Sequence, residues 1–185
     1  MPAGYVGPIA VQQVDGAALT NTTTATSLLA AHFKAAMAPA FFNSIGKTFR
    51  FMATGRISTV VTTPGTLTLD FRLGSVVAFN GGAMTLSTSA KTNVSWWLDM
   101  LLTVRAIGSG TSANILGVGR WTSEAAGATT VAGEAKSIML PASAPAAGTG
   151  FDSTASAAPD FFATWSVANA SNSIQCHQAA LFSVN

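Results

Sequence analysis

The longest unbroken alternation of apolar and polar side chains lies at residues 93–106 and constrains the fold most. The apolar positions of this stretch are Val94, Trp96, Leu98, Met100, Leu102, Val104 and Ala106. Such a period of two places all of them on one face of a β-strand, whereas a helix would scatter them around its axis. At about 3.3 Å per residue the strand would span roughly 40 Å, so we expect a bend or bulge within it.

A second clear alternation runs from residue 66 to residue 73. Its apolar face holds Leu67, Leu69, Phe71 and Leu73, and its polar face holds Thr66, Thr68, Asp70 and Arg72. One buried and one solvated face is typical of an antiparallel sheet. Five apolar residues of the two alternations are predicted to lie in the core: Leu69, Phe71, Trp96, Leu98 and Leu102.

Short strands separated by turn residues fill most of the remaining chain after residue 46. Further strands are predicted at residues 48–54, 56–61, 76–79, 84–86, 113–122, 135–140, 161–167 and 174–184. Gly55 predicts a bulge, Asn80-Gly81-Gly82 predicts a hairpin turn, and Gly117 with Gly119 indicates close approach of another backbone. The predicted fold class is all-β, an antiparallel β-sandwich of the jelly-roll type.

The first 42 residues follow a different pattern. Residues 1–26 are rich in Gly, Pro and Thr without a periodic apolar face, so they predict an N-terminal arm, with room for one short strand, before a single sandwich domain at 27–185. Within residues 27–42 the apolar spacing allows one or two helical turns, with Thr26 or Ser27 as N-cap and Pro39 as the stop.

The composition leaves little for enzyme chemistry, because only 9% of the residues are charged while 49% are hydrophobic. Cys176 is the single cysteine, which excludes an intrachain disulfide and a multi-cysteine metal site. The first residues lack the basic and apolar regions of a secretory signal, and no apolar stretch is long and uncharged enough to span a membrane. We expect no membrane partner, no cofactor and no metal.

Two short motifs resemble nucleotide-binding sequences only in part. Gly46-Lys47-Thr48 matches the end of a phosphate-binding loop, but Phe41 stands where the loop needs its first glycine, and Thr48 enters a predicted strand. Gly117 and Gly119 lack the third glycine of a dinucleotide fingerprint. We therefore expect no nucleotide site.

Catalytic arrangements are equally sparse. His32 and His177 are the only histidines, no nucleophile elbow is present, and Cys176 and His177 point to opposite faces of a predicted strand. Asp70 and Asp99 could in principle act together on a sugar, but cross-strand ion pairs are the simpler interpretation of such residues. The prediction is a protein without catalytic residues.

Two further features concern possible partners. The alternation places Trp96 in the core and Trp97 on the opposite face, where its ring could serve an interface or a glycan platform. The nine Lys and Arg residues are spread along the chain without a run, which disfavours nucleic acid as a partner.

Several segments resemble a group of tailed-bacteriophage virion proteins. They are Gly46-Lys-Thr-Phe-Arg, residues 54–74, Trp96-Trp-Leu and Arg105-Ala-Ile-Gly-Ser-Gly-Thr, within a region of roughly residues 27 to 124. The resemblance implies a jelly-roll module of the kind found in head-decoration, head-fibre or tail-associated proteins. It brings no catalytic residues with it.

Taken with the resemblance, these patterns favour a non-enzymatic virion structural protein assembled in the bacterial host cytoplasm. It would be a capsid decoration (cement) or head-fibre component acting as a homo-oligomer, with a trimer favoured, and bound to the major capsid protein or another virion protein. The apolar faces that carry Trp97, Leu101 and Phe162 would be covered by subunit contacts. The alternative is a glycan- or receptor-binding module of a tail or fibre protein, and a hydrolase on the same scaffold is a third hypothesis.

Overall fold

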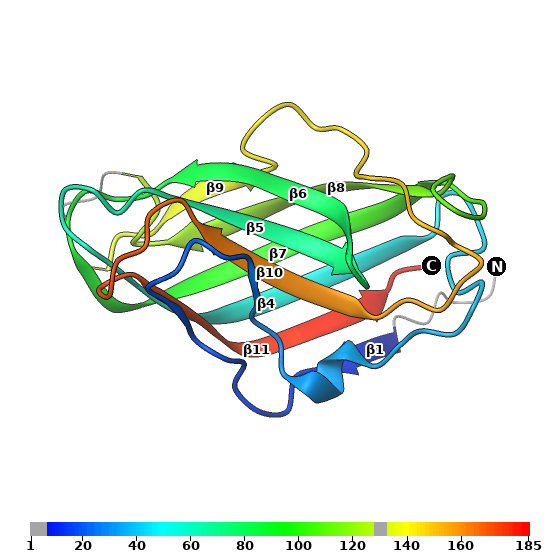
Figure 1. Cartoon of the computed structure of the whole chain (residues 1–185), viewed down its shortest axis with the longest axis horizontal. Helices are drawn as coiled ribbons and strands as arrows, with labels where there is room; N and C mark the ends of the chain where they lie inside the picture. Colours follow the sequence, from blue (N-terminus) through cyan, green and yellow to red (C-terminus); the bar gives the residue numbers. More distant parts are fainter. Residues whose placement is uncertain (1–6, 128–132) are drawn as a thin grey trace.

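The computed structural model describes residues 7–127 and 133–185, which form two antiparallel sheets packed face to face (Figure 1). The larger sheet contains, in spatial order, β1 (Gly7–Val11), β11 (Ser173–Ser183), β4 (Thr48–Thr59), β7 (Lys91–Ala106), β8 (Asn114–Ser123) and β9 (Lys136–Leu140), with β2 (Leu19–Thr20) beside β11. The smaller sheet contains β3 (Thr26–Ser27), β10 (Pro159–Trp165), β5 (Thr66–Leu73) and β6 (Val76–Thr85). The predicted all-β sandwich is confirmed.

The strand pairing is that of a jelly roll. Apart from β2, β8 and β9, each early strand pairs with a late one in nested order: β1 with β11, β3 with β10, β4 with β7, and β5 with β6. A long antiparallel ribbon of this kind, rolled so that its pairs alternate between two sheets, gives the two Greek keys of a jelly roll. Strands β8 and β9 then widen the larger sheet beyond β7.

The N-terminal segment is part of this roll. Within residues 7–27, β1 pairs with β11 in the larger sheet and β3 pairs with β10 in the smaller one, while Leu19 is buried in the core. The predicted boundary near residue 26 therefore does not separate an arm from the sandwich in the described part of the chain. The sequence pattern did not predict where these short strands lie, because their partner strands are at the other end of the sequence.

Of the one or two helical turns predicted within residues 27–42, the structure contains a single 3₁₀ turn, and the predicted N-cap is wrong. Ser27 belongs to β3, and Leu28 donates its N–H to the carbonyl of Phe161, so the expected N-cap is used for strand pairing. Among the described residues, the only helical element is a 3₁₀ turn at Ala31–Lys34, whose Phe33 packs edge-on against Phe51. Tertiary pairing has overridden a weak local propensity here.

The predicted hairpin at Asn80-Gly81-Gly82 is also wrong, because β6 continues through it. Asp70 pairs with Asn80 and Thr68 pairs with Ala83, so both glycines oppose one residue of β5 and form a bulge. Asn80 Oδ1 accepts the N–H of Gly82, whose φ of 71° favours glycine. The turn residues thus bend a strand instead of ending it.

Gly55 lies inside an unbroken β4, and the bulge is on its partner β11, between Cys176 and Gln178. A Cβ at Gly55 would lie 1.9 Å from the carbonyl oxygen of Gln175, so only glycine allows the two strands to pair there. In β7 the expected irregularities are register shifts near its two ends, opposite Ile57–Thr59 and between Val104 and Ala106.

Gly117 permits close approach of a side chain, Phe79 from the facing sheet, and not of a backbone as predicted. A Cβ at Gly117 would lie 2.2 Å from a ring carbon of Phe79. At Gly119 the neighbour is a backbone atom, since a Cβ would lie 2.7 Å from the carbonyl oxygen of Asp99. The two glycines thus allow β8 to pack closely against β6 of the facing sheet and against β7 beside it.

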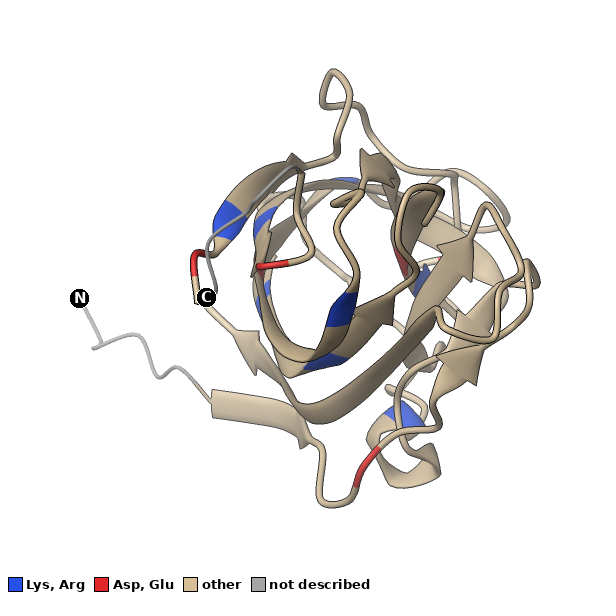
Figure 2. Ribbon diagram, turned by 90° about the vertical axis from the view of Figure 1, so that its left-hand side faces the viewer, with Lys and Arg blue, Asp and Glu red and all other residues tan. Residues whose placement is uncertain are grey.

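Figure 2 looks along the strands and shows the two sheets curving around a common core. All five residues predicted for the core are buried, namely Leu69, Phe71, Trp96, Leu98 and Leu102. The indole of Trp96 donates to the carbonyls of Arg56 and Gln175, so its polar atom is satisfied inside the sandwich. The strand registers proposed for these residues are confirmed.

Candidate functional site on the outer face of the large sheet

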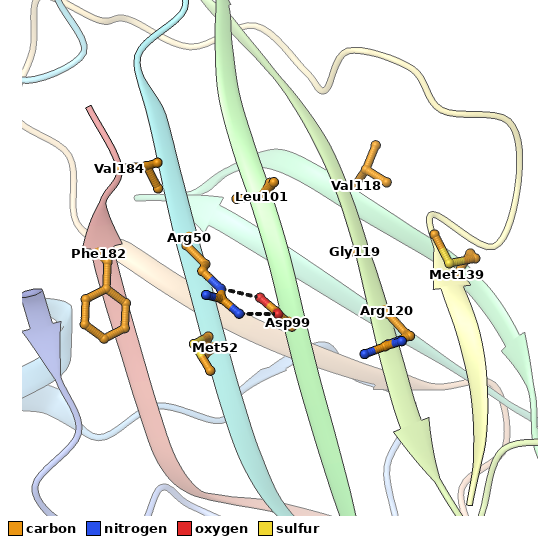
Figure 3. Close-up of a pocket in the computed structure, with 10 residues that line it drawn as sticks. All are labelled: Arg50, Met52, Asp99, Leu101, Val118, Gly119, Arg120, Met139, Phe182 and Val184. Carbon is orange, nitrogen blue, oxygen red and sulfur yellow. Dashed lines mark hydrogen bonds and ion pairs between the residues drawn. The ribbon is translucent and has the colours of Figure 1, made fainter. Parts of the chain in front are cut away.

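The outer face of the larger sheet carries the most developed candidate site. Alternation along the strands turns Arg50 and Met52 of β4 and Asp99 and Leu101 of β7 away from the core (Figure 3). Neighbouring strands add more lining residues: Val118, Gly119 and Arg120 of β8, Met139 of β9, Phe182 of β11, and Val184. The site is therefore assembled from five strands and the segment that follows β11.

Two adjoining hollows make up this face. The larger has a volume of about 700 Å³ and lies over the centre of the sheet. The smaller, of about 330 Å³, extends toward β1 and contains Trp97, and the two share Met52 and Phe182 as lining residues. Together they form an open trough, which we call the sheet trough and define by the lining residues of both hollows. Volumes of this size suit a small molecule or part of a chain.

An ion-pair row crosses the sheet trough. Arg50 Nε and Nη2 donate to the two carboxylate oxygens of Asp99 at 2.8 and 2.6 Å, a bidentate pair drawn as dashed lines in Figure 3. Arg120 lies on the other side, directly paired with Asp99 in the β7–β8 register. The hydrogen bonds from Arg50, with the charges of Arg50 and Arg120, lower the pKa of Asp99 below its ordinary value, although partial burial opposes them.

Large apolar side chains surround this row. The exposed fractions are 46% for Trp97, 49% for Leu101 and 60% for Met139. Aromatic residues, methionine and arginine are enriched where proteins bind partners, and exposed apolar groups that gather on one face indicate such contacts. The predicted exposure of Trp97 and Leu101 agrees with these values.

Phe162, the third residue predicted to lie on an exposed apolar face, is on the smaller sheet and half-buried. The guanidinium of Arg72 lies 3.9 Å from the centre of its ring, and Arg72 also pairs with Asp70 at 3.3 Å. Phe162 is thus covered by its own sheet and does not join the sheet trough.

The structure does not bring Asp70 and Asp99 together. Asp70 faces outward from the smaller sheet and Asp99 faces outward from the larger one. Stacked sheets are about 10 Å apart, so two carboxylates that face outward from opposite sheets are farther apart than the roughly 9.5 Å at which a glycosidase pair works. Burial raises the pKa of Asp70, which its bond from Arg72 partly offsets.

The two histidines contact the N-terminal segment, and the cysteine lies in the core. His32 Nε2 accepts the backbone N–H of Gln13 at 2.7 Å, and His177 Nδ1 lies 2.9 Å from a carboxylate oxygen of Asp15. Cys176 is buried, and desolvation raises the pKa of its thiol to about 12. Its thiol is therefore protonated at neutral pH, which does not suit a nucleophile.

The remaining sequence motifs have structural partners. Lys47 of the incomplete phosphate-loop motif donates to the carbonyl of Phe41 at 2.6 Å and lies over that ring. Within residues 7–127 and 133–185, no group of three or more His, Cys, Asp or Glu side chains is arranged to hold a metal ion. In the same residues, no helix has the length and apolar character needed to cross a membrane.

Sequence patterns singled out Trp97, Leu101 and Asp99 but not the apolar residues that complete the trough. Met52, Met139, Phe182 and Val184 join it from strands whose neighbours in space are distant in the chain. Their only signal was an apolar residue on the polar side of an alternating strand, as with Met52 between Arg50 and Thr54.

Comparisons with known proteins add little to this geometry. No protein-family model matches the chain, and no curated protein matches it. Among solved structures, it is similar to the CBM2 module of the evolved Dit of Lactobacillus casei BL23 phage J-1, at 10% sequence identity and a TM-score of 0.33. That match covers 99% of this chain and 80% of the other. A likeness at this level carries no argument, so the function is argued from the sheet trough itself.

Proposed function

We propose that this protein is a non-enzymatic binding module of a bacteriophage virion, and that it binds a glycan in the sheet trough. The virion setting rests on the sequence resemblance to tailed-phage structural proteins. The binding role is supported by one observation above all: the exposed indole of Trp97, on a long strand, lines a trough that also offers charged hydrogen-bonding groups.

The chemistry of the trough suits a sugar. An aromatic ring on a strand is a rigid platform for the apolar face of a pyranose, and little conformational entropy is lost when the sugar binds. The guanidiniums of Arg50 and Arg120 and the carboxylate of Asp99 supply donors and acceptors next to it. The Arg50–Asp99 pair also fixes both side chains before a ligand arrives, which lowers the ordering cost of binding.

A glycan array followed by affinity measurement tests this proposal. Trp97→Ala should weaken the binding of any glycan found on the array by at least tenfold, while its melting temperature stays close to that of the parent protein. Val61→Ala is the matched control, since Val61 is equally exposed but lies outside the trough. Equal affinities of the Trp97→Ala and parent proteins, or no bound glycan at all, would contradict a glycan site at this face.

A second candidate function is subunit contact in the virion. It is favoured by the exposed Leu101, Val118 and Met139, which offer apolar area and no hydrogen bonds to a sugar. In this case the same face would be covered in a homo-oligomer, with a trimer favoured, or would dock on the major capsid protein as a decoration or head-fibre component. Light scattering separates the two functions: an oligomer dispersed by Leu101→Asp supports subunit contact, and a monomer that binds glycan supports the first proposal.

A further inference from the structure

The arginines of the chain gather on the face that contains the sheet trough. The strands of the larger sheet hold four of them, Arg50, Arg56, Arg105 and Arg120, and all four are exposed. Asp99 is the only Asp or Glu within the same strands. The basic residues are scattered in the sequence, yet the fold collects the guanidiniums on one side of the sandwich; several of the blue positions in Figure 2 follow the curved large sheet.

Most of this positive charge is not neutralised by the residues that the structure describes. Arg50 takes both oxygens of Asp99, which leaves Arg120 with a shared carboxylate and no side-chain hydrogen bond among the described residues. Within residues 7–127 and 133–185, Arg56 donates only to the backbone carbonyl of Asn93. Arg105 has no hydrogen-bond or ion-pair partner in the part of the chain that the structure describes.

The smaller sheet shows the contrasting arrangement. There Arg72 pairs with Asp70, and Asp160 of β10 lies 3.7 Å from Lys34 of the 3₁₀ turn. Each of these basic side chains thus has its own acidic partner. The excess of positive charge is therefore a property of the larger sheet's outer face, where the trough lies.

The register spaces these arginines along the strands. Arg56 is level with Ser95 of β7, while Arg120 and Arg50 are level with Asp99 and Leu101, and Arg105 follows near the end of the strand. These positions form three tiers along the strands: Arg56, then Arg50 with Arg120, then Arg105. At about 3.3 Å per residue, successive tiers are roughly 15 Å apart. One small anion cannot reach two tiers, but a chain lying along the strands can. Trp97 lies between the first and second tiers.

We infer that the ligand of the sheet trough is an acidic polysaccharide, whose carboxylates pair with the three tiers of arginine and whose sugar rings stack on Trp97. This inference rests on the proposed glycan function and specifies its substrate class. The planar guanidinium fork fits a carboxylate in bidentate fashion, and Asp99 already occupies Arg50 in that geometry. Such contacts on an exposed face are screened by salt.

Binding of polygalacturonate, measured by calorimetry with uncharged dextran as comparison, tests the inference. We expect polygalacturonate to bind, dextran not to bind, and the affinity to fall at least tenfold between 50 and 300 mM NaCl. The double variant Arg105→Gln/Arg120→Gln should bind at least tenfold more weakly. It should fold normally, because neither side chain makes a hydrogen bond among the described residues. Lys34→Gln removes a charge remote from the trough and should bind like the parent.

Each other outcome overturns a defined part of the reasoning. If a neutral glycan binds through Trp97 while polygalacturonate does not, or if the double variant binds polygalacturonate like the parent, the acidic-ligand inference fails and the glycan function stands. If no glycan of either kind binds, both fail. If single-stranded DNA or polyglutamate binds as tightly as polygalacturonate, the site recognises charge alone and the polysaccharide assignment is wrong.

Discussion

The contact between Gly117 and Phe79 predicts a specific cost for one added methyl group. In Gly117→Ala the new Cβ would lie 2.2 Å from a carbon of the Phe79 ring, which is itself buried between the sheets. The ring cannot turn away into solvent, so β8 or the ring must shift. Overpacking of this kind costs about 1–3 kcal/mol. For a protein of this size, 2 kcal/mol lowers the melting temperature by roughly 4–8 °C.

A double-mutant cycle isolates this contact. Phe79→Leu removes the ring and should itself destabilise the protein, but Gly117→Ala should then cost at least 1 kcal/mol less than in the parent, as expected for residues in contact. Val118→Ala, at the exposed neighbouring position, should change stability by less than about 0.5 kcal/mol. Urea unfolding followed by tryptophan fluorescence measures the four proteins of the cycle and the Val118→Ala control. Additive effects in the cycle would refute the close approach of β8 to the facing sheet.

Three further predictions follow from the same structure. Deletion of residues 1–27 removes β1 and β3 and the buried Leu19, so the product should fail to fold, and a cooperative thermal transition by circular dichroism would contradict the jelly-roll assignment. In the folded protein the pKa of Asp99 lies below its ordinary value, so the ionised carboxylate stabilises the fold at pH values above the ordinary Asp pKa. This stabilisation is lost as the pH falls through the lower pKa of the folded state. In Asp99→Asn, urea unfolding measured at a series of pH values should show no such loss. Cys176, buried and with its pKa raised to about 12, should resist iodoacetamide at pH 8 until urea unfolds the protein, and rapid alkylation of the native protein detected by mass spectrometry would disprove its burial.

Local alternation was sufficient to predict the sandwich and much of its core. Where a strand has one apolar and one polar face, as in residues 66–73, the side-chain period alone fixes which residues are buried. The prediction failed where the local signal was ambiguous. Asn80-Gly81-Gly82 suits a turn and a bulge equally well, and only the partner strand β5 decides between them.

The sheet trough could be predicted only in small part. Trp97 and Leu101 lie on one strand, so alternation placed them together. The arginines did not form a run in the sequence, and their gathering depends on the order β4, β7, β8, in which β4 pairs with a strand that does not follow it directly in the chain. The same long-range pairing explains why residues 7–27 resembled an arm: their partners lie beyond residue 158.

The nested strand pairing also sets the order in which the molecule can fold. The β5–β6 hairpin needs only neighbouring residues, whereas β1 cannot be completed until β11 exists, since Gly7 pairs with Ser183. Contacts of such sequence separation are slow to form, and strands that wait for them expose unpaired edges. During synthesis on the ribosome, the first strands would leave the exit tunnel long before their partners. We expect the roll to close from the centre outward, with β1 docking last and the newly made chain most prone to aggregation until then.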